Sequence, residues 1–392
     1  MKQLEGSVED VKEVAGAGQK LTIVHFMPWS GMGGVEIATL RLTAATRDKF
    51  RHVAFCLPDA IALIDAFKKS GIETVIYAPP QPSLRHAPKF YKESLAVARQ
   101  IRQAGADVVH FSDEKAAIHN SLAALLAGSR RVCHLRVSYP TLPLRERLCL
   151  LPIQSFIFVS KEAKDTFAMS LPESKARVVY DAIEVPTDDI LANTAVVRSE
   201  LGIPEDAPVV GVVARVSRQK DYFTLADSAV EVLARHPSTR FLIVGDNSLV
   251  DLNRSHYEEV AKKLEELGIA DSFIFTGHRT DVPRLIAAMD ICVLCTHREG
   301  FPLSILETMA MRKPVIATAV GGIPEIIQPG VNGYLHGHGN SKELADAIVS
   351  LIENPEKVKR FGTAAVEHVK QNFSLQGFID EISKVYSDVM HA

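Results

Sequence analysis

The sequence has few of the features that mark secreted, membrane-spanning or nucleic-acid-binding proteins. It contains five cysteines in 392 residues, and such a low, odd count predicts a reducing compartment rather than a disulfide framework. No run approaches roughly 18 consecutive apolar residues, so no transmembrane helix is expected. The formal net charge is only −3, which argues against nucleic acid as the main partner. The first residues, MKQLEGSVEDVKEVAGAGQK, are polar and partly acidic, unlike a secretory signal. We therefore expect a cytoplasmic globular protein.

Three further absences narrow the range of reactions and cofactors. The glycine-rich loop Gly31–Gly34 is not the dinucleotide fingerprint, because Val35 and Glu36 stand where its third glycine should follow. No Asp-x-Asp lies at a plausible strand end, so no catalytic metal is expected. The pair Cys292 and Cys295 forms a C-x-x-C without a second ligand pair, inside an apolar strand. The sequence thus disfavours a nicotinamide oxidoreductase, a metal centre and a redox motif.

Apolar runs of strand length recur along the chain and alternate with helical segments. Such alternation predicts a parallel sheet covered on both faces, with ligands at the carboxyl ends of the strands. The chain is also too long for one ordinary core, so two domains are expected. In the first half the predicted strands are 21–27, 52–57, 74–78, 107–111, 131–137 and 155–160, and a helix is predicted from Val35 to about Thr46.

The pattern breaks near Val185–Asp189 and then begins again. The second series of predicted strands is 209–215, 240–246, 272–277, 290–295, 314–318 and 333–337. We therefore expect a boundary near residue 186, with domains at 1–186 and 187–373. Two similar α/β domains of the Rossmann type would face each other across a cleft.

The segment Arg298–Glu307 sets two carboxylates eight positions apart across a loop-to-helix junction. Gly300 permits a sharp turn, and Pro302 suits the first helical position. Glu299 is then expected just before the first turn of a helix and Glu307 more than a turn inside it. The two residues would be separated by roughly 7 to 8 Å along the helix axis. The free backbone N–H groups between them favour an anion. This layout matches a sugar nucleotide, which carries hydroxyls, then a diphosphate, then ribose hydroxyls.

A basic loop follows the first strand of the second half. Arg215 offers a planar fork for phosphate, and Lys220 offers a compact point charge. Two such cations can stabilise a diphosphate leaving group as its negative charge develops, without a metal ion. Arg218 lies between them and can equally be a surface charge.

The run EGFPLSILETMAMRKPVIATAVGGIPEII, with its E-x7-E, resembles the signature of the retaining, GT-B-type glycosyltransferases of family 4. The likeness covers most of the chain and is weaker in the N-terminal half. It implies that Glu299 contacts the donor sugar, that Glu307 binds the ribose, and that the last helix (374–392) crosses back to the first domain. It also implies that Arg215 and Lys220 match the cations of the family's G-R-L pattern, although Ala214 replaces the usual glycine. The remaining residues that the resemblance places against the donor are Gly33, Gly34, His278, Arg279, Gly300, Phe301, Pro302 and Leu303.

Three positions depart from the family pattern. Many members carry a histidine where this chain has Arg136, so the first-domain contact to the donor falls to Arg136 or to the neighbouring His134. Asp181 replaces the asparagine of the family's N-G turn. Arg312 replaces the glycine expected after the E-x7-E helix, so that helix end is expected to lack its left-handed residue.

The resemblance implies a transferase that needs no metal and no cofactor, with a UDP- or GDP-sugar as donor substrate. The acceptor can be a glycan, a glycolipid or a small molecule, because family members build polysaccharides, lipopolysaccharide cores, glycolipids and thiol glycosides. Peripheral contact with the cytoplasmic face of a membrane is compatible with such acceptors. The alternatives are another GT-B-fold enzyme, such as a nucleotide-sugar epimerase or a phosphorylase, or a non-catalytic nucleotide-sugar-binding protein.

Overall fold

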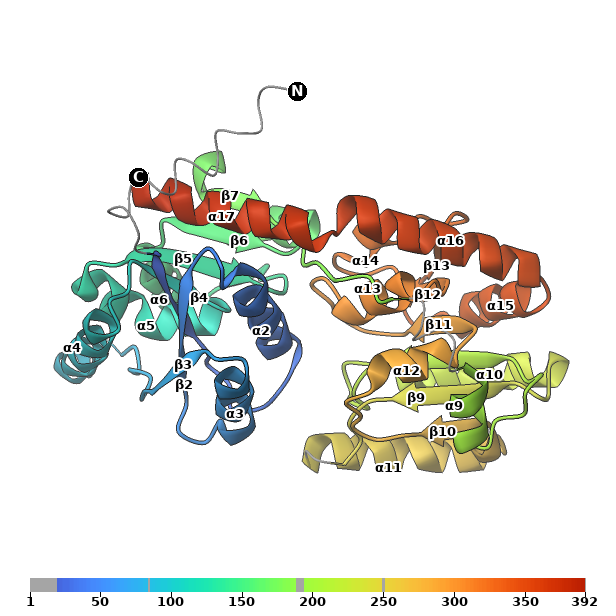
Figure 1. Ribbon diagram of the computed structural model, residues 1–392. Helices are drawn as coiled ribbons and strands as arrows, with labels where there is room; N and C mark the ends of the chain where they lie inside the picture. Colours follow the sequence, from blue (N-terminus) through green and yellow to red (C-terminus); the bar gives the residue numbers. More distant parts are fainter. Residues whose placement is uncertain (1–19, 84, 188–193, 249–250, 392) are drawn as a thin grey trace, which may run out of the picture. The chain divides into compact units, whose positions relative to one another are not determined.

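Two all-parallel sheets organise the chain, and each belongs to its own unit of the computed structural model (Figure 1). The structure describes residues 20–83, 85–187, 194–248 and 251–391. The first unit comprises the described residues up to Asp181 together with those from Leu375 onward, and the second comprises Ala182–Ser374. The boundary predicted from the sequence, at residue 186, lies a few residues later than this one.

The first unit is built on a sheet ordered β3-β2-β1-β4-β5-β6-β7. Its strands are β1 (Thr22–Phe26), β2 (Arg51–Cys56), β3 (Glu73–Ile76), β4 (Val108–Phe111), β5 (Arg130–Leu135), β6 (Ser155–Phe158) and β7 (Ala176–Val178). Its helices are α2 (Gly34–Thr46), α3 (Ile61–Lys69), α4 (Ala87–Gln103), α5 (Glu114–Ala127), α6 (Leu144–Leu150), α7 (Lys161–Asp165) and α17 (Leu375–His391). The six strands predicted in this half are confirmed. The short strand β7 was missed, because three residues with a central arginine give little periodic signal.

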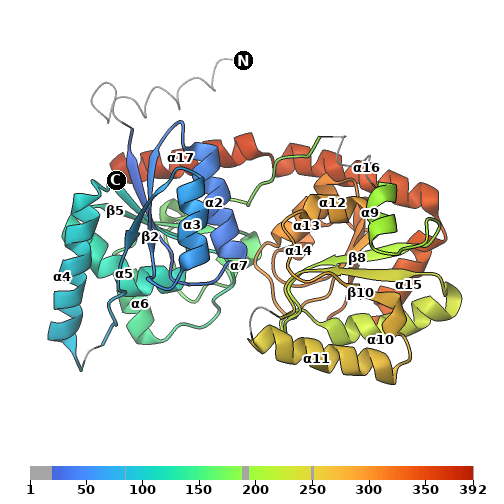
Figure 2. The same cartoon turned by 60° about the horizontal axis from the view of Figure 1, so that its bottom comes forward.

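Helices cover both faces of this first sheet (Figure 2). The face that carries Phe26, Phe55 and Phe111 packs with α4 and α5 into the larger core. The opposite face packs against α2, α3 and α17. Because both faces are buried, the strands are nearly continuous apolar runs.

A row of four buried histidines crosses the face beneath α17. His52, His25, His110 and His134 lie on the neighbouring strands β2, β1, β4 and β5, with ring centroids 5.1, 5.1 and 5.4 Å apart. His25 Nε2 lies 3.0 Å from His52 Nδ1, and His110 Nδ1 lies 2.7 Å from the hydroxyl of Tyr386 on α17. We call these four residues the histidine row. Burial lowers the pKa of each, so the row is neutral near pH 7.

The second unit repeats the architecture with a sheet ordered β10-β9-β8-β11-β12-β13. Its strands are β8 (Val209–Val213), β9 (Arg240–Val244), β10 (Phe273–Phe275), β11 (Ile291–Leu294), β12 (Val315–Thr318) and β13 (Gly333–His336). Its helices are α9 (Thr194–Glu200), α10 (Tyr222–Arg235), α11 (Asp251–Glu266), α12 (Val282–Ala287), α13 (Leu303–Ala310), α14 (Ile323–Ile326), α15 (Ser341–Ile352) and α16 (Pro355–Asn372). All six predicted strands of this half are confirmed.

The order of both sheets places the first strand of each unit in the middle, with later strands added on both sides. This is the doubly wound, Rossmann-like arrangement, in which ligands gather at the carboxyl ends of the central strands. The predicted fold class is confirmed. Among the helices in the described ranges, none is both long and apolar enough to cross a membrane.

Candidate functional site

The basic loop after β8 is held against the loop after β9 by backbone contacts. Ala214 N donates to Val244 O at 3.0 Å, and Val216 N donates to Asp246 O at 2.8 Å. A Cβ on Gly245 would lie 2.1 Å from Ala214 O, so only glycine allows this approach. Arg215, between the two anchored residues, is exposed at the carboxyl edge of the sheet. Its place fits the phosphate contact predicted for it.

Lys220 and Glu299, two of the predicted catalytic residues, form an ion pair in the second unit. Lys220 Nζ contacts Glu299 Oε1, and the two side chains are only 13% and 11% exposed. Thr296 Oγ1 also donates to Glu299 Oε1 at 3.3 Å. Gln219 Nε2 donates to Arg298 O at 2.7 Å, which ties the two loops together. The fold thus joins a cation and a carboxylate that lie 79 residues apart in sequence.

The glycine turn before α14, Gly321–Gly322, packs against the backbone of Glu299 and Gly300. Gly321 has φ +55°, and a Cβ there would lie 1.9 Å from Glu299 O. Gly322 N donates to Gly300 O at 2.9 Å. In the sequence, Gly321 stands within the run EGFPLSILETMAMRKPVIATAVGGIPEII that carries the family resemblance. The structure makes it a positioning residue, because any side chain would push the Glu299 backbone away.

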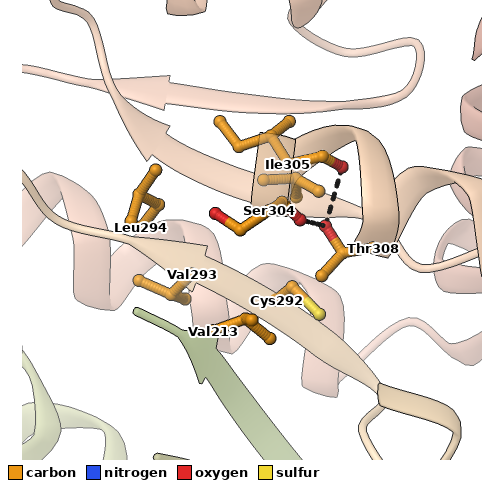
Figure 3. A pocket seen from close by; sticks show the side chains of 8 residues that line it. Val213, Cys292, Val293, Leu294, Ser304, Ile305 and Thr308 are labelled. Atoms are coloured by element: carbon orange, nitrogen blue, oxygen red, sulfur yellow. Dashed lines mark hydrogen bonds between the residues drawn. The ribbon is translucent and has the colours of Figure 1, made fainter. Parts of the chain in front are cut away.

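The helix that carries the second carboxylate, α13, is anchored on the strand ends. Ser304, Ile305 and Thr308 line a small pocket with residues of β8, β11 and β12, and Thr308 Oγ1 donates back to Ser304 O at 3.0 Å and Ile305 O at 2.9 Å (Figure 3). Helix α13 begins at Leu303, and Glu307 lies one turn inside it, half-buried. The expectation that Pro302 is the first helical residue is wrong by one position. Pro302 is the N-cap, with φ −73° and ψ 111°, because its ψ stays extended.

The residues between the two carboxylates differ in exposure. Phe301 is buried, and its ring packs edge-on against Phe373 at 5.4 Å between centroids. Its side chain therefore packs within the second unit. Leu303 is partly buried at the first turn of α13.

The loop predicted to hold the nucleotide base follows β10. Arg279 donates to both carboxylate oxygens of Asp281, at 2.8 and 2.7 Å. These hydrogen bonds lower the pKa of Asp281 to about 2. His278 is exposed beside the turn at Gly277. The guanidinium of Arg279 is therefore engaged within the loop, whereas His278 is exposed.

In the first unit the predicted glycines begin α2. Gly33 is the N-cap residue, Gly34 is the first helical residue, and Gly33 N donates to Glu36 Oε2 at 2.9 Å. Glu36 is buried, which raises the pKa of its carboxyl, and its Oε1 has no hydrogen-bond partner among the residues that the structure describes. A buried acceptor without a partner costs free energy, and a hydrogen-bond donor from a ligand would remove that cost. Glu36 is therefore a candidate ligand-binding residue at the start of α2.

Arg136, predicted to contact the donor, is buried and paired with Asp181. Arg136 Nη1 lies 2.7 Å from both carboxylate oxygens of Asp181, and Nη2 lies 3.3 Å from His134 Nδ1. These are two of the three positions at which the sequence departs from the family pattern. The pair explains both departures together, because a buried arginine requires a carboxylate partner. His134 is fully buried at the end of the histidine row.

Sequence reasoning missed a polar cluster at the carboxyl ends of β1 and β4. Trp29 Nε1 donates to Asp113 Oδ2 at 2.8 Å, and Lys115 Nζ lies 4.0 Å from the Trp29 ring centroid. Asp113 also caps α5 by accepting from Ala116 N at 2.8 Å. Burial raises the pKa of Asp113. The signal was present in the sequence, since Asp113 lies two residues after the end of the predicted strand 107–111.

Arg312, after α13, adopts the left-handed conformation that the sequence analysis expected this helix end to lack. Its φ is +57°, the one positive φ among the non-glycine residues that the structure describes. Helix α16 packs closely there, because a Cβ on Gly362 would lie 2.1 Å from Arg312 O. The backbone keeps the left-handed turn although the glycine is gone.

We therefore expect Arg312→Gly to stabilise the protein against urea by about 1 kcal/mol, since glycine adopts φ > 0 without strain. Arg312→Ala is the matched control, because it removes the same side chain but keeps the strained backbone. Equal midpoints of urea unfolding for the two variants would show that the backbone strain is not the cause.

Comparison with known proteins agrees with this site. Two family models match adjacent parts of the chain: "Glycosyltransferase Family 4" matches residues 32–185, and "Glycosyl transferases group 1" matches residues 194–368. Together they cover most of the sequence. The second match contains the basic loop, both carboxylates and the glycine turn.

Relatives and solved structures point the same way. The chain is 26% identical over 226 residues to an N-acetyl-alpha-D-glucosaminyl L-malate synthase of Bacillus anthracis, covering 58% of this chain and 57% of the relative. It is 31% identical over 198 residues to a D-inositol 3-phosphate glycosyltransferase of Corynebacterium aurimucosum, covering 49% and 46%. The matched region thus spans about half the length of these relatives.

The fold matches over nearly the whole chain. HepE of Anabaena superposes with a TM-score of 0.80 at 22% identity, covering 94% of this chain and 100% of that one. A glycosyltransferase from Rickettsia africae superposes with a TM-score of 0.80 at 20% identity, covering 95% and 99%. The chain has two Rossmann-like units, and the two family models match consecutive parts of it that correspond to these units. It therefore belongs to the GT-B glycosyltransferases of family 4, group 1.

Proposed function

We propose that the protein is a retaining glycosyltransferase that moves a sugar from a nucleoside-diphosphate-sugar to an acceptor hydroxyl without a metal ion. The observation that carries this proposal is the Lys220–Glu299 ion pair at the carboxyl edge of the second sheet. It sets a cation for phosphate beside a carboxylate for sugar hydroxyls, directly before the helix that carries Glu307. Family membership supports the same reaction class.

The donor binds along the segment from the basic loop to α13. Arg215 and Lys220 contact the diphosphate, Glu299 accepts hydrogen bonds from sugar hydroxyls, and Glu307 accepts hydrogen bonds from the ribose. The backbone N–H groups at the start of α13 add a favourable dipole for phosphate. A UDP- or GDP-sugar fits this order of groups. The structure of HepE was solved with UDP-glucose, which supports the uridine donor.

The transfer reaction depends on how the site stabilises the negative charge of the leaving diphosphate. As the glycosidic bond to the donor breaks, the diphosphate oxygen gains negative charge, and Lys220 and Arg215 stabilise it in a partly buried place. An oxygen of the departing diphosphate can take the proton of the acceptor hydroxyl on the same face, so the anomeric configuration is kept. No second carboxylate is required as nucleophile. Before the donor arrives, Lys220 and Glu299 hold each other in position, and the donor exchanges this contact for phosphate and hydroxyl.

The acceptor is a hydroxyl of a glycan, a glycolipid or a small molecule, and the protein acts in the cytoplasm or at the inner face of a membrane. The names of the two relatives contain L-malate and D-inositol 3-phosphate, which supports a small anionic acceptor. In the first unit, Glu36 and the Trp29–Asp113 pair offer hydrogen-bonding groups at the carboxyl edge of the sheet.

Separate roles are expected for the two carboxylates, and calorimetry tests them. Glu307→Ala should weaken binding of the free nucleoside diphosphate, because it removes a ribose contact. Glu299→Ala should leave that affinity nearly intact but impair sugar transfer, because it removes a sugar contact. Free UDP and GDP are titrated into each variant, and transfer is then assayed with the donor that binds. If Glu299→Ala loses nucleotide affinity as severely as Glu307→Ala, the assigned roles are wrong.

Activity is expected to survive chelation, because the two cations replace a divalent ion at the diphosphate. Turnover in EDTA should stay within about twofold of turnover in magnesium, since Lys220 supplies the charge that stabilises the leaving group. Complete loss in EDTA that magnesium or manganese restores would contradict the metal-independent mechanism.

A further inference from the structure

Three side chains with metal-ligating atoms converge in the second unit, outside the groups assigned to the donor. The ligand atoms of Asp221, His297 and His338 all lie within 4.8 Å of one another. His297 Nδ1 lies 2.6 Å from His338 Nε2 and 4.0 Å from Asp221 Oδ2. Among the described residues this is the one group of three or more such side chains with this spacing. We call it the His-His-Asp cluster.

The cluster is assembled by the sheet rather than by one flexible segment. Asp221 ends the basic loop after β8 and caps α10, His297 follows β11, and His338 follows β13. All three strands are parallel, so their carboxyl ends meet at one edge. The His297 backbone is fixed to the basic loop, because His297 N donates to Gln219 O at 2.9 Å.

One ligand is rigid and two are free to adjust. Asp221 is buried, and its Oδ1 accepts from Thr224 N at 3.2 Å while its Oδ2 accepts from Thr224 Oγ1 at 2.6 Å. These hydrogen bonds orient the carboxylate, as the partners of metal-bound carboxylates do. Both imidazoles are exposed at the surface, with the His297 side chain 48% exposed, so small ring rotations can bring them to ligand distance.

Two imidazole nitrogens and one carboxylate oxygen select the kind of metal. Magnesium and calcium prefer oxygen ligands, whereas zinc takes nitrogen at about 2.0–2.1 Å and carboxylate oxygen at about 2.0–2.2 Å. A tetrahedral site needs four ligands, so water would complete the set. His297 Nδ1 and His338 Nε2 lie 2.6 Å apart and share one proton as a hydrogen bond, and a bound cation would replace that proton.

We propose that Asp221, His297 and His338 bind one Zn²⁺ ion. The ion would join three loops of the second unit, two of which also carry Lys220, next to Asp221, and Glu299, two residues after His297. It lies outside the sugar-transfer chemistry and would reinforce loops that the Lys220–Glu299 and Gln219–Arg298 contacts already join, so its removal by EDTA leaves turnover within the range expected above. Binding requires no donor, so this site can be tested apart from the proposed function.

The experiment titrates ZnCl₂ alone into the full-length chain without a polyhistidine tag, after EDTA treatment and buffer exchange, in a calorimeter. We expect one ion per chain with micromolar or tighter affinity. His297→Ala and His338→Ala should each weaken binding at least tenfold. Both side chains are exposed, and equal melting temperatures in EDTA confirm that the variants fold. A tetrahedral Co²⁺ absorption spectrum that both variants lose would give the same assignment independently.

The matched control is His236→Ala in the same unit. His236 lies beside the carboxylate of Glu353, with Nε2 3.4 Å from Oε1, and belongs to no metal-ligand group among the described residues, so its removal should leave zinc affinity unchanged. Absence of saturable binding would overturn the proposal. Unchanged affinity in both cluster variants, or equal losses in all three variants, would also overturn it.

Discussion

Replacing Lys220 by alanine is expected to lower kcat/KM by roughly 10² to 10³, the cost of losing one preorganised group that stabilises transition-state charge. The physical reason is the burial of the site. Lys220 and Glu299 are both largely shielded from water, so the charge on Lys220 acts on the leaving diphosphate with little screening. Arg215→Ala should show a similar but smaller loss, because Arg215 is exposed to solvent.

Arg218→Ala is the matched control for Lys220→Ala. Arg218 lies in the same loop and carries the same charge, but its side chain is 71% exposed and is paired with Glu259. Its removal changes the net charge equally and should leave kcat/KM within about twofold, since surface pairs contribute little. Melting temperatures of all variants separate loss of charge from loss of fold.

The outcome that would reject the assignment is unchanged kcat/KM in both Lys220→Ala and Arg215→Ala. A loss in Arg218→Ala as large as that in Lys220→Ala would also reject it, because the effect would then follow net charge rather than place. A KM increase with unchanged kcat would indicate that Lys220 binds the donor equally before and during bond breaking.

Much of the fold could be predicted from the sequence because parallel strands buried on both faces leave a strong signal. Twelve apolar runs were identified as strands, and the structure contains a strand at each. The glycine and proline residues around α13 likewise marked the loop-to-helix junction before Leu303. The family motifs then identified four candidate site residues: Glu299, Glu307, Arg215 and Lys220.

Contacts between distant side chains could not be predicted in the same way. The sequence showed Arg136 and Asp181 as two separate departures from the family pattern, 45 residues apart. Only the fold reveals that one departure neutralises the other in a buried pair. The close approach of Gly321 to Glu299 O and the left-handed Arg312 depend on backbone geometry that residue type alone does not fix.

The histidine row is a further case, and its consequence is a stability that depends on pH. The sequence singles out His134 only as the neighbour of Arg136, and the row as a whole requires the register of four strands. Burial lowers the pKa of His52 to about 4 and that of His110 to about 3, and it lowers the pKa of His25 and His134 well below the ordinary value. Each histidine is therefore neutral in the folded protein at pH values where it is protonated in the unfolded chain.

The sign follows from proton binding. Below about pH 6.5 the unfolded chain takes up protons that the folded row does not, so the free energy of unfolding falls as pH falls. Stability from the row is complete above that pH and is lost toward the folded pKa values. At pH 5, His52 and His110 should each reduce the free energy of unfolding by roughly 2 kcal/mol. Glu36, Asp113 and Glu114 have raised pKa values, mainly through burial, and contribute with the opposite sign.

Because those carboxyl groups oppose the row, the decisive measurement is a difference between variants. His110→Gln keeps a hydrogen-bonding group for Tyr386 and removes one titrating imidazole. The drop in unfolding free energy between about pH 7.5 and pH 5 should shrink by roughly 2 kcal/mol relative to the unchanged protein.

The single tryptophan, Trp29, lies in the first unit, so its fluorescence during urea unfolding reports on the unit that holds the row. His86→Gln, at an exposed histidine of the same unit, should leave the pH dependence unchanged. An equal pH dependence in His110→Gln and in the unchanged protein would show that the buried row does not control acid stability.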